Sequence, residues 1–325
     1  MVLKKNKYYW GVSLKNPEPV VDDYYISDEI IVEDGDLIQK IERLRELIIS
    51  YCVMIEKDRN SASKILDEIH SIIVSMDKIQ YTEFIAFWKV LDMSYSVFKK
   101  LPNQEFILEE LLQRYCERRR KLYDKIGYSN VTVQALYDSG ASRKKGASGI
   151  TKLVDLIHGT FDETFRVSRV DNLHTLMTTS IGYFLPDKGD KSLFREFCRR
   201  FDIQYNFGRD HQGKEPDMVL KVNSHFFIIE AKHIKESGGA QDKQIVETIE
   251  FIRYSENLDN IHYLSFMDGV YFNNFIWTKS NNESKINRQR KAIEEYLDEN
   301  KSNFFVNTAG LINLLKDLLE EIKNE

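Results

Sequence analysis

The residues best placed for chemistry are Asp217, Glu230 and Lys232. Asp217 opens one short run of β-forming residues, Glu230 and Lys232 end the next run, and the turn-forming pair Asn223-Ser224 separates the two. This arrangement predicts a β-hairpin. Because side chains alternate between the faces of a strand, Glu230 and Lys232 should share one face while their apolar neighbours enter a core on the other. Charges directly after the apolar run that precedes Glu230 need a partner or a metal, since unpaired charges are costly to remove from water.

The order Pro216-Asp217, hairpin, Glu230-Ala231-Lys232 resembles the PD-(D/E)xK motif in the form found in type II restriction endonucleases. The resemblance covers about residues 129–277. It implies that Asp217 and Glu230, with the carbonyl of Ala231, hold a divalent metal, and that Lys232 lies beside the attacking water. Magnesium is the expected metal, because it is typically held by one or two carboxylates together with substrate phosphate.

Two other interpretations compete with this assignment. A second Pro-Asp pair, Pro186-Asp187, precedes loop-forming residues, so Asp187 would have no hairpin partner near Glu230, and Asp217 is preferred. Glu230 and Lys232 could also be an ordinary ion pair on an edge strand.

Basic residues are concentrated in one segment of an acidic chain. The formal net charge is −5, yet residues 113–145 carry nine Lys and Arg against three Asp and Glu. This segment ends in a glycine-punctuated stretch, which predicts a loop that contacts DNA, although a solvated linker has the same composition. A Gly-Gly pair before a later predicted helix suggests a second contact with DNA. The expected DNA-binding residues are Ser142, Arg143, Lys144, Lys145, Gln241 and Lys243.

The periodicity of apolar residues predicts two parts. Residues 1–126 should form an N-terminal arm and a helical subdomain, because apolar residues recur there at spacings of three and four. Residues 127–325 should form the nuclease domain, with strands at Ile261–Met267 and Val270–Trp277 and with C-terminal helices. The expected fold class is α/β, a mixed β-sheet flanked by helices.

Composition excludes several classes of protein. The 325 residues include no run near the ~20 apolar residues of a membrane span, and the N-terminus lacks the apolar region of a secretory signal. Cys52, Cys116 and Cys198 are odd in number and widely spaced, which favours reduced thiols and a cytoplasmic location. No phosphate-binding G-x-x-x-x-G-K-[ST] sequence is present, so no nucleotide cofactor is expected.

These observations and the resemblance together predict a magnesium-dependent type II restriction endonuclease that cuts double-stranded DNA at a short specific sequence. A homodimer is expected, because a two-fold axis presents equivalent sites to antiparallel strands. Two alternatives stay open: a defence or repair nuclease that reads DNA modification or structure, and an inactive DNA-binding protein on a nuclease scaffold.

Overall fold

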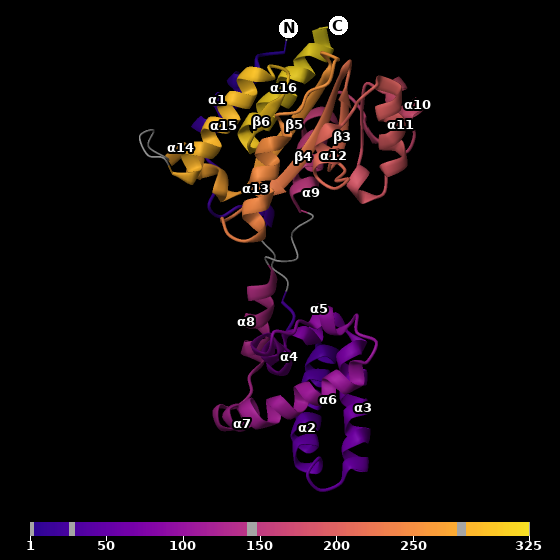
Figure 1. The fold of residues 1–325 in the computed structure, drawn as a ribbon, viewed down its shortest axis with the longest axis vertical. Coiled ribbons are helices and arrows are strands. Elements are labelled where there is room, and N and C mark those ends of the chain that lie inside the picture. Colours follow the sequence, from indigo (N-terminus) through magenta and orange to yellow (C-terminus); the bar gives the residue numbers. More distant parts are fainter. Residues whose placement is uncertain (1–2, 26–29, 142–147, 278–283, 325) are drawn as a thin grey trace. The chain divides into compact units, whose positions relative to one another are not determined.

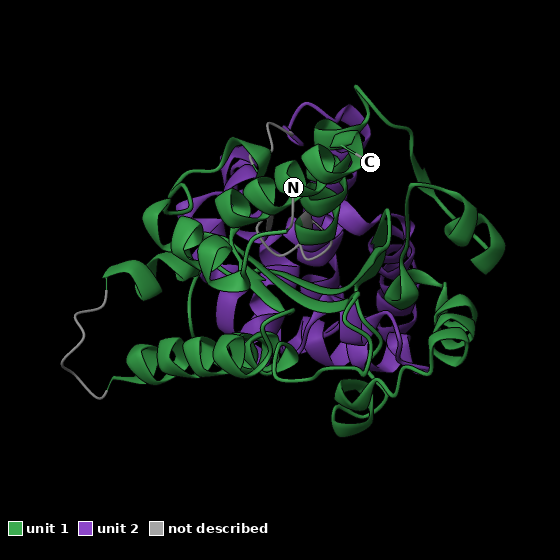
Figure 2. Ribbon diagram, turned by 90° about the horizontal axis from the view of Figure 1, so that it is seen from above, with its two compact units in different colours: residues 1–26, 145–325 green, residues 27–144 purple. Residues whose placement is uncertain are grey.

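The chain forms two compact units in a computed structural model that describes all residues except 1–2, 26–29, 142–147, 278–283 and 325. One unit contains residues 1–26 and 145–325 and the other residues 27–144 (Figure 2). The expected boundary at 126/127 therefore differs from the observed division. The N-terminal helix α1 (Asn6–Lys15) packs against the C-terminal helix of the sheet unit, and α8 (Asn130–Ala141) packs in the helical unit.

The sheet unit is built on six strands in sequential order (Figure 1). The second, third and fourth strands form an antiparallel meander. The other neighbouring strands of the sheet pair in parallel, so the sheet is mixed. The predicted α/β class, a mixed sheet flanked by helices, is confirmed. The strands are β1 (Val167–Arg169), β2 (Ile181–Phe184), β3 (Met218–Val222), β4 (His225–His233), β5 (Ile261–Asp268) and β6 (Phe304–Val306).

Helices cover both faces of the sheet. Helices α1, α9 (Ser148–Phe161) and α16 (Thr308–Asn324) bury one face. The other face is covered by α10 (Leu173–Thr178), α11 (Lys191–Phe201), α12 (Asn206–Asp210), α13 (Ala240–Phe251) and α15 (Lys285–Glu299). Short helical turns complete the unit: η1 (Asp23–Tyr25), η6 (Pro186–Lys188), η7 (Val270–Phe272) and α14 (Asn273–Trp277).

The predicted strand at Val270–Trp277 is wrong, because this segment forms η7 and α14. Its aromatic residues Tyr271, Phe272 and Phe275 are buried at a spacing that suits a helix as well as a strand. Gly269, which precedes it with φ +95°, allows the turn to lie against Ile234, whose carbonyl oxygen would be 2.5 Å from a Cβ at this position. The predicted strand at 261–267 and the hairpin are confirmed.

The second unit is helical, as predicted for this part of the chain. Its core is formed by the buried faces of α2 (Gly35–Met54), α3 (Arg59–Ser75) and α6 (Gln104–Tyr115) with shorter elements around them. The shorter elements are η2 (Asp77–Tyr81), α4 (Glu83–Trp88), η3 (Lys89–Leu91), α5 (Tyr95–Phe98), a π-helical turn η4 (Cys116–Arg120), α7 (Lys121–Ile126) and α8. No helix among the described residues is long and apolar enough to cross a membrane.

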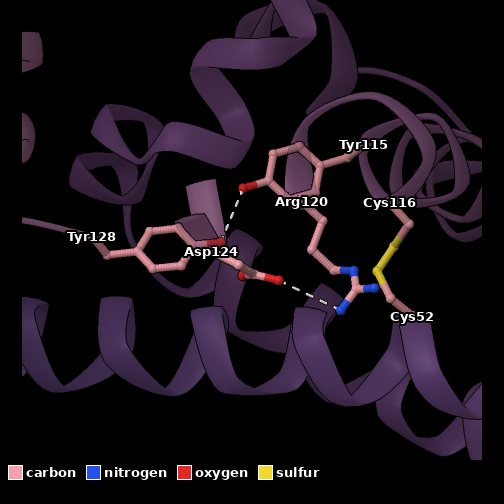
Figure 3. The surroundings of a disulfide bond; sticks show 6 residues. All are labelled: Cys52, Tyr115, Cys116, Arg120, Asp124 and Tyr128. Atoms are coloured by element: carbon pink, nitrogen blue, oxygen red, sulfur yellow. Dashed lines mark hydrogen bonds and ion pairs between the residues drawn. A yellow bond between two sulfur atoms is a disulfide. The ribbon is translucent and has the colours of Figure 1, made fainter. Parts of the chain in front are cut away.

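A disulfide joins Cys52 of α2 to Cys116 at the end of α6 (Figure 3). The expectation of reduced thiols is therefore wrong for these two residues, while Cys198 is free and half-buried. The sequence separation of 64 concealed the proximity of the two cysteines, because only the packing of α2 against α6 brings their Cα atoms to 5.8 Å.

We expect the replacement Cys52→Ala to lower the free energy of unfolding by about 2–4 kcal/mol, because the cross-link restricts the unfolded chain. Thermal unfolding with and without reductant measures the effect. Wild type should lose stability in reductant, whereas Cys52→Ala should not respond. The control Cys198→Ala should respond to reductant as wild type does. A wild-type midpoint unchanged by reductant would contradict the prediction.

His262 at the start of β5 is buried, and burial together with the neighbouring His225 lowers its pKa to about 4. Its Nδ1–H donates to the carbonyl of Ser302 at 2.7 Å, and its Nε2 faces Nδ1 of His225. The other ring nitrogen of His225, Nε2, contacts Glu321.

As the pH falls, the His262 side chain is protonated in the unfolded chain before it is protonated in the folded protein. Stability should therefore be lost between about pH 6.5 and pH 4. We expect the contribution of His262 to the free energy of unfolding to fall by about 2 kcal/mol between pH 7 and pH 5. Urea denaturation at both values tests this, and His262→Asn, which can keep the bond to Ser302, should show a correspondingly smaller loss. Equal pH dependence in the two proteins would contradict it.

Candidate functional site

The β3–β4 hairpin brings Asp217, Glu230 and Lys232 together at one end of the sheet. Met218 pairs with Ile229, and the backbone N–H of Asp217 donates to the Ile229 carbonyl at 3.0 Å. The apolar residues that alternate with Glu230 and Lys232 lie in the core against α9 and α16. The predicted sharing of one face by the two charged residues is therefore confirmed.

The three side chains meet at one ammonium group. The Nζ of Lys232 lies 2.8 Å from Oδ2 of Asp217 and 2.8 Å from Oε1 of Glu230. The backbone N–H of Ala231 donates to the same Oδ2 of Asp217 at 2.8 Å, while its side chain is buried on the opposite face. Two carboxylates and an amine are thus held within hydrogen-bonding distance by a rigid element.

Two further side chains extend this cluster, and the sequence did not single out either. The Nζ of Lys214 lies 2.6 Å from Oε1 of Glu230 and 2.9 Å from Oε2 of Glu247. Lys214 comes from the loop before β3 and Glu247 from α13, so no periodic pattern connects them to the motif. The only signal was the position of Lys214 shortly before Pro216-Asp217 in the chain.

Glu230 is the most deeply buried charge of the cluster, with an exposed fraction of 0%. Burial and the charge of Asp217 raise its pKa, although the two ammonium groups oppose the shift. Burial acts to lower the pKa of Lys232, but Glu230 and Asp217 outweigh it and raise that pKa above its ordinary value. Lys232 therefore carries a positive charge here and acts as a hydrogen-bond donor.

One oxygen of Glu230 lacks a partner. Its Oε2 is buried and accepts no hydrogen bond from the described residues. A buried carboxylate oxygen left in this state is costly. A divalent cation that prefers hard oxygen ligands would satisfy it, so Asp217 and Glu230 fit the expected metal ligands chemically.

The other predicted residues fall into three groups. The rival Asp187 lies exposed in η6, after β2. Gln241 and Lys243 lie in the first turn of α13, where Lys243 Nζ is 3.6 Å from Glu247 of the cluster. The remaining expected DNA contacts, Ser142, Arg143, Lys144 and Lys145, lie outside the described residues.

A second acidic cluster lies at the end of β5 on the opposite face of the sheet. One carboxylate oxygen from each of Glu18, Asp22 and Asp268 lies within 4.8 Å of the others, so this buried triad could hold a metal ion. Lys152 of α9 already lies among them, with Nζ 2.7 Å from Asp22, 3.0 Å from Asp268 and 4.0 Å from Glu18. His233, the residue after Lys232, contacts Asp268 at 3.0 Å.

The protonation of this triad is uneven. Burial and the charge of Asp268 raise the pKa of Glu18 to about 7. Burial alone would raise the pKa of Asp268 too, but hydrogen bonds from His233 and Tyr25 and the charge of Lys152 lower it. Lys152 thus supplies the positive charge that the three carboxylates require. Sequence patterns could not find this cluster, because its members come from an N-terminal arm, a helix and a strand end.

Comparisons of the chain with protein-family models, with curated proteins and with solved structures return no match. The assignment of function therefore depends on the residues of the site and their geometry.

We expect the substitution Lys152→Met to lower the free energy of unfolding by about 3–5 kcal/mol, because it leaves buried carboxylates without their cation. Chemical denaturation measures the loss. Added magnesium should recover more stability in this variant than in wild type, since binding to the folded state alone is stabilising. Lys291→Met, which breaks an exposed pair with Glu295, is the control and should change stability by less than about 1 kcal/mol. A fully stable Lys152→Met protein would rule out this role.

Proposed function

We propose that this chain is a magnesium-dependent DNA endonuclease of the type II restriction kind. The observation that carries the proposal is the convergence of Asp217, Glu230 and Lys232 at the end of a hairpin, in the order and spacing of the PD-(D/E)xK motif. The unpartnered Oε2 of Glu230 supports a cation at this position.

The chemistry follows from the charges of these groups. Magnesium bound here would supply Lewis-acid activation of the attacking water and would neutralise charge on the phosphoryl oxygens. Asp217 and Glu230 would hold it, because one carboxylate directly precedes β3, the other lies in β4, and both face the same ammonium group. The protonated Lys232 is positioned to orient the water and to donate a hydrogen bond to the scissile phosphate. In the hydrolysis, the water oxygen would form a bond to phosphorus as the bond to the leaving oxygen breaks, the water would lose a proton to solvent, and the leaving oxygen would take one up.

The cluster favours an active nuclease over an inactive DNA-binding scaffold. A fully buried Glu230 held by two ammonium groups is costly to maintain, since desolvation of charges offsets much of their attraction. A protein that only bound DNA would have no use for it. A defence or repair nuclease would use the same chemistry and differ in the DNA that it reads. Double-stranded DNA is the proposed substrate, and a homodimer is the proposed assembly.

We expect Asp217→Asn, Glu230→Gln and Lys232→Ala each to reduce cleavage by about 100-fold or more, because each removes a metal ligand or a donor at the scissile phosphate. Digestion of plasmid DNA with magnesium, and with a chelator as the blank, measures the rate. Circular dichroism checks that each variant is folded.

The matched control is Asp187→Asn, which should cut within a few-fold of wild type because Asp187 is exposed in η6. Wild-type rates in Lys232→Ala would refute the proposed role of this residue. If Asp187→Asn were inactive and Asp217→Asn active, Asp187 of the Pro186-Asp187 pair would be the metal ligand in place of Asp217.

A further inference from the structure

An open pocket adjoins the cluster of Asp217, Glu230 and Lys232. It has a volume of about 670 Å³ and is lined by residues of α11, of α12 and of the loop that leads into β3. Lys214 belongs to both sites, because it lines the pocket while its Nζ contacts Glu230. Glu215, another lining residue, precedes Pro216-Asp217 in the chain. A group held in this pocket would therefore be a near neighbour of a phosphate at Asp217 and Glu230.

Three guanidinium groups line the pocket, from Arg195, Arg199 and Arg209. Their hydrogen bonds go to uncharged oxygens: Arg199 Nε donates to the Arg195 carbonyl at 3.3 Å, and Arg209 contacts two side-chain amides at 3.4 and 3.5 Å. None of the three forms an ion pair with any part of the chain that the structure describes. Guanidinium groups that lack a carboxylate partner are suited to bind phosphate oxygens.

Besides the charged Lys214 and Glu215 and the polar Gln204, the remaining lining is largely apolar. Phe194 and Ile203 are buried, and the half-buried Cys198 lies between the arginines of α11 in sequence. A pocket of about 300–1,000 Å³ with apolar walls and a few convergent charges is typical of sites for small organic ligands. An aromatic base packs well against such walls and against guanidinium planes. The composition therefore matches a base and a phosphate together better than a phosphate alone.

The loop between α11 and α12 also lines the pocket, and it is held in an uncommon conformation at Tyr205. This residue has φ +44° and ψ +55°, a left-handed conformation that is unusual for a bulky side chain. The carboxylate of Glu256 holds it by accepting the backbone N–H groups of Gln204 and Tyr205 at 3.0 and 3.1 Å. The result is a phenol that is more than nine-tenths buried, and its hydroxyl has no hydrogen-bond partner among the described residues. Tyr205 is therefore a fixed part of the pocket wall.

We propose that this pocket, the arginine pocket, binds one unstacked nucleotide of the DNA strand beside the cleavage position. Its phosphate contacts Arg195, Arg199 and Arg209, and its base lies against the apolar walls. This assignment rests on the proposed function, because that function supplies the DNA and the neighbouring scissile phosphate. The pocket fixes the position of the strand relative to Lys232, as contacts to the phosphate backbone do in other DNA-binding proteins.

The test is a calorimetric titration of the full-length protein with the four deoxynucleoside 5′-monophosphates in the presence of EDTA. The chelator removes metal-dependent binding at Asp217 and Glu230, so the titration reports the arginine pocket without any need for cleavage. We expect Arg199→Gln and Arg209→Gln each to weaken binding by about tenfold, the loss expected for a hydrogen bond to a charged group. Arg200→Gln is the matched control, because Arg200 is exposed on the same helix and does not line the pocket.

Inorganic phosphate and the deoxynucleosides serve as the two partial ligands, and both should bind more weakly than the monophosphates. Phosphate binding as tight as that of the monophosphates would overturn the nucleotide assignment, because the base would then contribute nothing. An equal loss of monophosphate affinity in Arg200→Gln and Arg199→Gln would show that the nucleotide does not bind in the arginine pocket. If the protein cuts plasmid DNA but binds no monophosphate, the proposed nucleotide pocket is wrong and the proposed nuclease function is retained. Monophosphate binding by a protein that never cuts DNA would show that the proposed function had failed alone.

Discussion

The fully buried carboxylate of Glu230 sets the strongest physical constraint on the sheet unit. A charge without solvent needs charged partners at short range, and Lys232 and Lys214 provide two of them at 2.8 and 2.6 Å. Lys214 in turn contacts Glu247 of α13, and Lys232 contacts Asp217 of the hairpin. The loop before β3, the hairpin and the helix after it are therefore held around one side chain. A rigid surrounding of this kind is what a metal-dependent site requires.

The parallel pairing of β4 with β5 gives the sheet two charged clusters at the same end. His233 pairs with Asp268 in register, and Lys232, one residue earlier, points to the other face. One face therefore carries the Asp217–Glu230–Lys232 cluster, and the other carries the acidic triad with Lys152 among its carboxylates. The triad also ties down the N-terminal arm, because Glu18 accepts the backbone N–H of Thr308 at the start of α16. The N-terminal arm, the end of β5 and the start of α16, which are far apart in sequence, are thus held together at this end of the sheet.

Much of the fold was predictable from local patterns, and the errors have identifiable physical causes. The alternation along residues 225–233 and the helical spacing from Leu37 onward gave the hairpin and the helical unit. Local patterns carry no information about long-range packing, so they missed the docking of α1 on α16 and the Cys52–Cys116 disulfide. The segment 270–277 was mistaken for a strand because a short run of buried aromatic residues fits both periodicities.

The sequence by itself determined the order of chemical groups: a carboxylate, a tight turn, and Glu-Ala-Lys at a strand end, whose facing follows from the period of two along a β-strand. It could not supply Lys214, Glu247 or the arginine pocket, because these come from loops and helices whose positions depend on packing rather than on periodicity. It also could not show that Lys152 lies among three carboxylates. Tertiary structure decided these contacts, since charges separated by a hundred residues or more meet only when the sheet and its helices close around them.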